Sequence, residues 1–211
     1  MRKLPALIIA LLTMLAGAAA NAQAAPAEQQ GAPSAQPVVP APPAVTGMLA
    51  FSSTEGRFSV ELPGAPKTSA RPLTLQGGGA STLHQFWVDL DSDNITYMVI
   101  YNDYPADYAS ASPQELLQTM RDGIVRDKIL TSDVPMELFG VPGRAFTAMD
   151  KDGWQYAVHQ FLDGTRLYQL IVVNNKDHPA ARTEQFMNSF RIAGSQPAGA
   201  NPGAAPLPPS D

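Results

Sequence analysis

The 211-residue chain contains no cysteine. This absence excludes disulfide bonds, thiolate metal sites, cysteine nucleophiles and an N-terminal cysteine that could carry a lipid. Stability must therefore come from an ordinary hydrophobic core, and the region 47–195 is long enough to supply one within a single domain.

Basic residues are scarce. Lys and Arg number 14 against 19 Asp and Glu, which gives a formal net charge of −5. Loss of Arg2 and Lys3 with an N-terminal signal leaves 12 basic residues against 19 acidic ones, a net charge of −7. Such a chain is repelled by nucleic acids and by anionic membranes, so neither is an expected partner.

Long apolar runs are also missing, apart from one near the N-terminus. The run Leu4–Leu15 follows Arg2 and Lys3 and precedes a stretch of small residues, a pattern typical of a secretory signal peptide over residues 1–24. Two small-x-small sites predict cleavage after Ala22 or Ala24.

An uncleaved membrane anchor is the alternative to a cleaved signal. The apolar run contains Pro5 and falls short of the roughly 20 residues that a spanning helix needs, which favours cleavage. Every later apolar run is interrupted by polar residues within a few positions. We therefore expect a periplasmic or secreted protein with no transmembrane span after cleavage.

Proline and alanine dominate both ends of the mature chain. Residues 25–46 are predicted to be a disordered linker and residues 196–211 a disordered tail, because they have almost no large apolar residues to bury. These segments are interpreted either as solvated spacers or as docking peptides for aromatic grooves. The folded domain then covers residues 47–195.

Between these tails, short alternating apolar segments separated by turn residues predict β-strands. Phe58, Val60 and Leu62 share one face of a strand, and Asp163-Gly164 is the best hairpin signal. The other predicted strands are 71–75, 81–90, 95–104, Met136–Phe139, Arg144–Met149, Trp154–Leu162 and Thr165–Val173.

Two segments have helical periodicity. Ser112 and Glu115 form a capping box around Pro113 and predict a helix to about Lys128. Within this helix, close packing against the sheet is the expected reason for Gly123. A second helix is predicted from Pro179 to about Phe190.

That second helix is expected to have Asp177 or His178 as its cap and to bury Phe186, Met187 and Phe190. Strands, a helix, more strands and a final helix predict an α+β fold: a single antiparallel β-sheet of about six to eight strands flanked by two helices.

Several segments of this series resemble exported bacterial proteins of the PsbP-like superfamily. They are G-R-F-S-V-E-L-P-G (56–64), Y-N-D-Y-P (101–105), G-V-P-G-R-A-F (140–146), T-R-L-Y-Q-L-I-V-V (165–173) and F-M-N-S-F-R-I (186–192). The resemblance implies an antiparallel sheet sandwiched by helices, used as a non-catalytic accessory or binding domain. It transfers no ligand residues to this chain.

Two arginines are candidates for an anion site. Arg144 follows the turn of Gly140, Pro142 and Gly143, and is interpreted as a solvated strand residue or a surface ion pair. The alternative is that Arg144 and Arg166 line a groove for an anionic ligand.

The aromatic residues are expected to form the core, with a ligand pocket as the alternative. They are Phe86, Trp87, Tyr97, Tyr101, Tyr104, Trp154, Tyr156 and Tyr168.

No motif indicates catalysis or metal binding. His84, His159 and His178 lack metal-ligand spacing, and the chain has neither a G-x-S-x-G nor an S-x-x-K motif. Gly77-Gly78-Gly79 is interpreted as a loose turn, because a phosphate-binding loop needs a following helix.

The acidic turn of Asp89, Asp91 and Asp93 lacks the glycine and glutamate of a calcium loop. We therefore expect no catalytic residue, cofactor or metal, and assign no ligand-binding residue.

Three hypotheses remain. The first is a monomeric, non-catalytic accessory domain that engages an envelope protein through a sheet face or edge. The second is a small-molecule or lipid carrier with a pocket between the sheet and the first helix. The third is a hydrolase with an unrecognised site that uses His84 or His159.

Overall fold

The computed structural model describes residues 47–75, 79–90, 92–106 and 112–195. The predicted signal segment, linker and tail lie outside these ranges, as do Gly77, Gly78 and Asp91. Among the described residues no helix is long and apolar enough to cross a membrane.

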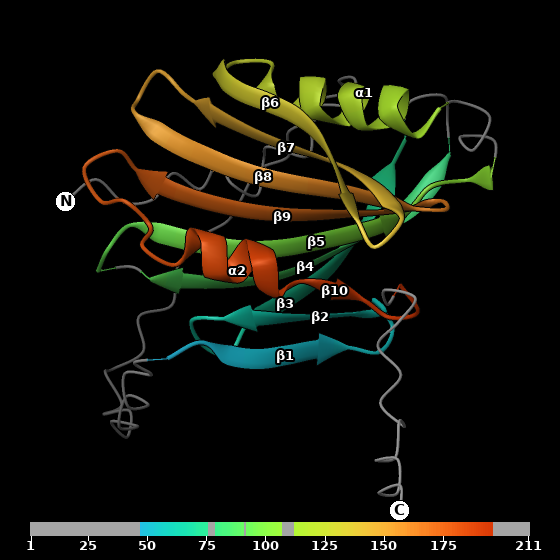
Figure 1. Cartoon of the computed structure of the whole chain (residues 1–211), viewed down its shortest axis with the longest axis horizontal. Helices are drawn as coiled ribbons and strands as arrows, with labels where there is room; N and C mark the ends of the chain where they lie inside the picture. The colour runs from blue at the N-terminus through green and yellow to red at the C-terminus, as the bar shows by residue number, and fades with distance from the viewer. Residues whose placement is uncertain (1–46, 76–78, 91, 107–111, 196–211) are drawn as a thin grey trace, which may run out of the picture.

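Seven antiparallel strands form the larger of two sheets (Figure 1). In spatial order they are β3 (Lys67–Thr74), β4 (Ala80–Leu90), β5 (Ile95–Asp103), β9 (Arg166–Asn175), β8 (Trp154–Asp163), β7 (Val141–Met149) and β6 (Ile129–Leu138). The predicted hairpin at Asp163-Gly164 is confirmed. β8 and β9 are paired as far as the turn, where Asp163 lies opposite Arg166, and Gly164 has a positive φ of 62°.

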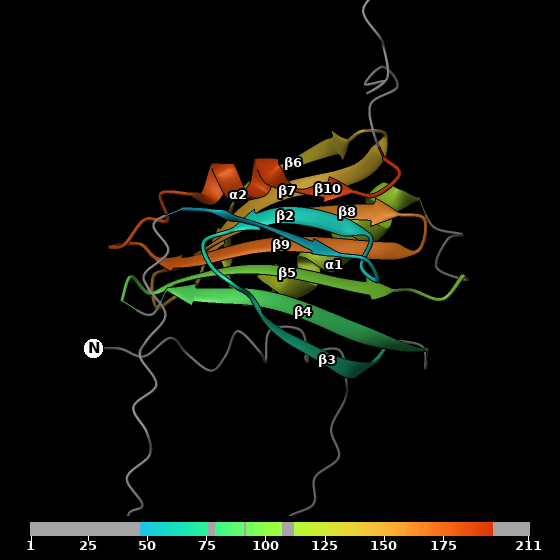
Figure 2. The same ribbon diagram turned by 90° about the horizontal axis from the view of Figure 1, so that it is seen from below.

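Three further strands form a separate small sheet, so the prediction of a single sheet is wrong. β2 (Phe58–Leu62) lies between β1 (Leu49–Ser53) and β10 (Arg191–Ile192). Figure 2 shows this sheet lying over one face of the large one. The alternation of Phe58, Val60 and Leu62 correctly predicts a buried face for β2, but a period of two does not specify which strands pair.

The capping box is confirmed at the start of α1 (Pro113–Val125). The Ser112 Oγ accepts a hydrogen bond from the Glu115 N–H, and a Glu115 carboxylate oxygen accepts one from the Ser112 N–H, each over 3.2 Å. α1 ends three residues before Lys128 and packs on β6, β7 and β8.

The second helix, α2 (Thr183–Ser189), is shorter than predicted. It begins after Arg182, which makes no side-chain capping bond, so the predicted caps Asp177 and His178 are wrong. Phe190 is buried as expected but has extended backbone, because the chain turns there into β10 beside β2.

The large sheet is buried on both faces at its centre. Tyr97, Val99 and Tyr101 of β5 face a core shared with the small sheet and α2, whereas Met98 and Ile100 face the core on the side of α1. The two helices therefore cover opposite faces of the large sheet, as Figure 2 shows.

Two glycines differ in what surrounds them. A Cβ at Gly123 in α1 would meet nothing within 4 Å, so the prediction that Gly123 allows close packing is wrong. A Cβ at Gly143 in β7 would lie 2.6 Å from the Phe161 ring and 2.7 Å from the Gln160 carbonyl oxygen. Gly143 is therefore required by the spacing of β7 and β8.

We expect Gly143→Ala and Gly123→Ala to change stability in opposite directions. Overpacking against backbone should lower the free energy of unfolding of Gly143→Ala by about 1–3 kcal/mol. Gly123→Ala should raise it by about 0.5–1 kcal/mol, because alanine favours the helix and meets no neighbour. Urea unfolding of both variants measures this, and a loss of stability in Gly123→Ala would contradict it.

Candidate functional site

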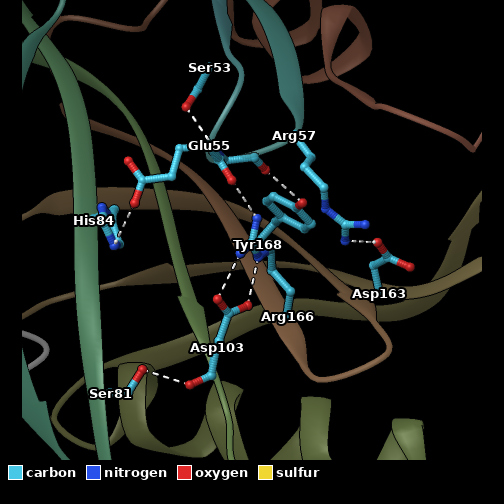
Figure 3. Close-up of polar contacts among 10 residues, drawn as sticks. Ser53, Glu55, Arg57, Ser81, His84, Asp103, Asp163, Arg166 and Tyr168 are labelled. Atoms are coloured by element: carbon cyan, nitrogen blue, oxygen red, sulfur yellow. Dashed lines mark hydrogen bonds and ion pairs between the residues drawn. The ribbon is translucent and has the colours of Figure 1, made fainter.

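Polar side chains gather where the turn between β1 and β2 meets the large sheet (Figure 3). Asp103 at the end of β5 pairs in register with Arg166 at the start of β9. The Arg166 guanidinium donates two parallel hydrogen bonds to the Asp103 carboxylate, over 2.6 and 2.7 Å. This fork is the geometry in which arginine binds a carboxylate most strongly.

The same arginine also binds the small sheet. Its third nitrogen donates to the Glu55 carbonyl oxygen over 2.8 Å, and the Tyr168 hydroxyl donates to the Gly56 carbonyl oxygen over 2.8 Å. We call Arg166, Asp103 and Tyr168, with the two carbonyls they hold, the Arg166 clamp. It fixes the β1–β2 turn onto the large sheet.

Two more residues surround the clamp. Arg57 pairs with Asp163 over 2.6 Å at the solvent side. The His84 ring stacks on Tyr101 with centroids 4.4 Å apart. Its Nε2 lies 3.8 Å from a Glu55 carboxylate oxygen (Figure 3).

The pKa shifts indicate a closed ion pair. The hydrogen bonds from Arg166 hold the pKa of Asp103 below its usual range, and the same bonds raise the pKa of Arg166. Burial, with a smaller contribution from Glu55, raises the pKa of Tyr101 to about 12. Charged Asp103 and Arg166 and a neutral Tyr101 suit a structural role better than proton transfer.

Beside the clamp, a groove of about 380 Å³ contains a serine, a histidine and an aspartate, namely Ser81, His84 and Asp103. They do not form a catalytic triad. The Ser81 hydroxyl donates to the Asp103 backbone carbonyl over 2.6 Å, and the Asp103 carboxylate is held by Arg166. The required bond from nucleophile to base is not made.

The other histidines lie apart from His84. His159 is on β8, which β5 and β9 separate from β4, so three strand spacings of about 4.8 Å lie between them. Burial lowers the pKa of His159. His178 is exposed on the approach to α2. The structure therefore does not bring the three histidines together.

Arg144 and Arg166 lie on opposite faces of the large sheet and do not share a groove. Arg144 forks onto Asp133 over 2.6 and 2.7 Å, and Arg121 of α1 binds the same carboxylate. Arg166 reaches the small sheet instead. Each arginine is satisfied by a carboxylate of the protein itself.

In the acidic turn of Asp89, Asp91 and Asp93, the Asp89 carboxylate is bound by neighbouring side chains of the protein. Asp89 accepts hydrogen bonds from Lys67, Trp87 and Thr96 over 2.9–3.0 Å. Asp91 lies outside the described residues. Across the described ranges, no group of three or more His, Asp or Glu could hold a metal ion.

Most of the predicted aromatic set is core. Tyr97, Tyr101, Trp154, Tyr156 and Tyr168 are buried. Of the set, only Tyr104 lines the cavity between α1 and the β8–β9 hairpin, whose volume is about 10 Å³. That space holds about one water molecule, so the carrier hypothesis receives no support from it.

A larger groove, of about 760 Å³, lies on the other side of the β1–β2 turn. The β1–β2 turn supplies Arg57, β10 supplies Arg191, and the β6–β7 turn supplies Phe139. Sequence reasoning missed Arg57, Phe139 and Arg191 as site residues. The available signal was Phe139-Gly140, a large apolar residue where a tight hairpin turn favours asparagine or glycine.

Comparison with known proteins gives a fold likeness only. Cyanobacterial PsbP (CyanoP) from Synechocystis sp. PCC 6803 is 12% identical, with a TM-score of 0.45 over 69% of this chain and 92% of that chain. A protein of unknown function from Pseudomonas aeruginosa, PA94, is 11% identical, with a TM-score of 0.28 over 62% of this chain and 85% of that chain. No family model and no curated protein matches. No site or function follows from these likenesses.

We expect Arg166→Gln to loosen the small sheet before the large one. Loss of the fork and of the bond to Glu55 should lower the free energy of unfolding by about 2 kcal/mol. Amide hydrogen exchange should accelerate in β1 and β2 more than in β7 and β8. Arg126→Gln, at an exposed position after α1, is the control with the same charge change. Uniform acceleration in all strands would contradict the clamp.

Asp133 should make stability depend on pH. The hydrogen bonds from Arg144 lower its pKa below the ordinary carboxyl value, so its contribution is present above about pH 4 and is lost as pH falls through the lowered pKa. Asp133→Asn should cost about 3 kcal/mol at pH 7, because Arg144 loses its carboxylate and Arg121 keeps only Asp122. The same variant should lose less stability than the unchanged protein as the pH falls below about 4. Urea unfolding from pH 7 to pH 3 measures both effects, with Asp177→Asn at an exposed position as control. If the free energy of unfolding of Asp133→Asn fell as steeply below about pH 4 as that of the unchanged protein, this role would be refuted.

Proposed function

We propose that the protein is an exported, non-catalytic accessory domain that binds an envelope protein through side chains of β6. The N-terminal signal pattern supports export. The observation that carries the proposal is the apolar surface of this edge strand.

Exposed apolar side chains concentrate on β6. In the described part of the chain, five large apolar side chains are exposed, and four of them lie on β6 or the turn after it. These are Ile129 (64% exposed), Leu130 (38%), Val134 (51%) and Phe139 (40%). Singly exposed apolar residues are ordinary, but a concentration on one strand marks an interaction surface.

A bulge brings two of these residues to one face. The register shifts between Leu130 and Ser132, so Ile129 lies opposite Met149 and Val134 opposite Ala145. Directly opposed residues share a face, and Met149 and Ala145 are an even number of positions apart on β7. Without the bulge, Ile129 and Val134 would point to opposite faces. We call Ile129 and Val134 the β6 surface.

The partner is expected to contact side chains and not the open strand edge. Pro135 lies within β6 and Pro72 within β3, the two edge strands of the large sheet. Proline offers no N–H for pairing with another strand, and natural proteins use it to protect exposed edges.

The double variant Ile129→Ser, Val134→Ser should fold normally and lose its partner. Both side chains are exposed, so the thermal midpoint should stay unchanged, while each lost apolar contact should weaken binding about tenfold. Crosslinking in intact cells, followed by purification of the tagged protein from the envelope fraction, measures the yield of the bound protein.

Leu49→Ser, which removes an exposed apolar side chain from β1, is the matched control. Deletion of residues 196–211 should leave binding intact. Recovery of the partner with the double variant, or its loss with Leu49→Ser, would refute the proposal. The N-terminus of the purified protein, expected at Gln23 or Ala25, tests export in the same sample.

A further inference from the structure

The groove of about 760 Å³ beside the β1–β2 turn has the size of a small-ligand site. It lies between the β1–β2 hairpin, β10 with the residues after it, and the β6–β7 turn. We call it the basic groove, because Arg57 and Arg191 line it and no Asp or Glu among the described residues does. This local charge is opposite to that of the whole chain, whose net charge is −5.

The two arginines differ in how far their charge is compensated. Arg57 binds Asp163 over 2.6 Å, although half of its side chain is exposed. Arg191 donates through one nitrogen to the carbonyl oxygens of Asn188 and Phe190. Within the described residues Arg191 has no carboxylate partner. A guanidinium in this state offers its remaining N–H groups to a carboxylate or a phosphate.

Phe139 is an unexpected residue for its backbone conformation. It and Gly140 form the two-residue turn between β6 and β7, with φ of 50° and 86°. Positive φ at both positions favours asparagine and glycine, and a bulky side chain is strained there. Phe139 is also 40% exposed. Strain held at an exposed aromatic residue points to a use for the ring.

The ring and the charge lie together. The Arg191 guanidinium carbon lies 5.6 Å from the centre of the Phe139 ring. Ser52, Ser59 and Ser195 line the same groove, and a serine hydroxyl can donate a hydrogen bond to an anion. The groove therefore combines an anion-binding group with an apolar surface.

We propose that the basic groove binds a small ligand in which an oxyanion, carboxylate or phosphate, is attached to an apolar ring or chain. Arg191 binds the oxyanion, Arg57 adds a weaker attraction because Asp163 shares its charge, and Phe139 packs on the apolar part. This site is separate from the β6 surface and does not depend on a protein partner.

The experiment is a titration of the ¹⁵N-labelled protein, purified from cells that express the full-length chain, with four probes at low salt. Benzoate and phenyl phosphate should shift the amide signals of Arg57, Phe139 and Ala193. Benzyl alcohol lacks the charge and inorganic phosphate lacks the ring, so both should bind at least tenfold more weakly. Preference for one organic anion over the other identifies the oxyanion.

Three variants test the assignment. Arg191→Gln should weaken binding of the preferred organic anion at least tenfold and Arg57→Gln less, whereas Arg126→Gln on the side of α1 should leave it unchanged. Phe139→Asn should weaken the binding of benzoate and phenyl phosphate without changing the affinity for inorganic phosphate. Its thermal midpoint should be unchanged or higher, because asparagine suits the positive φ.

The proposal is overturned if none of the probes shifts these amides at millimolar concentration, or if Arg191→Gln and Arg126→Gln weaken binding equally. Equal affinity for phenyl phosphate and inorganic phosphate would show that Phe139 does not pack on the ligand. Because Phe139→Asn is not expected to destabilise the fold, a loss of binding in that variant cannot be attributed to unfolding.

Discussion

The pairing of Arg166 with Asp103 is the interaction on which the arrangement of the two sheets depends. The small sheet has only three strands, and β10 contains two residues. Apolar contacts press the small sheet onto the large one but do not fix its position along the strands, because the hydrophobic effect is not directional. The ion pair of Arg166 and Asp103 supplies a directional contact. Its position is set by the pairing of β5 with β9, and one guanidinium nitrogen of Arg166 binds the Glu55 carbonyl oxygen. The β1–β2 turn held in this way separates the groove beside His84 from the basic groove.

Features with a local cause could be predicted from the sequence. The capping box of Ser112 and Glu115 depends on four consecutive residues, and the hairpin at Asp163-Gly164 on two turn residues. The alternation along β2 correctly gave its buried face. The division into two sheets could not be read in this way, because β1 and β10 both pair with β2 although Leu49 and Ile192 lie at opposite ends of the domain sequence. Strand β6 was predicted only from Met136, since most of its side chains are exposed and its bulge breaks the period of two.

The candidate site was hidden from the sequence for the same reason. Arg57, Phe139 and Arg191 come from three distant segments, and nothing in their local surroundings shows that they meet. Arg144 and Arg166 were the arginines that the sequence suggested as site residues. Each is bound by a carboxylate of the protein, and the two ion pairs lie on opposite faces of the large sheet. Conspicuous arginines proved structural, whereas Arg191, which has no carboxylate partner among the described residues, lies in a two-residue strand that the sequence did not predict.

The arrangement of β1 and β10 on either side of β2 has a mechanical consequence. Among the described residues β1 is the first strand and β10 the last, and both run antiparallel to β2. The start of β1 lies opposite Leu62 at one end of β2, whereas the end of β10 lies opposite Phe58 at the other. A tension applied through Leu49 and Ile192 would therefore pull β1 and β10 in opposite directions along β2. Their hydrogen bonds would be loaded together in shear and not broken one after another by peeling.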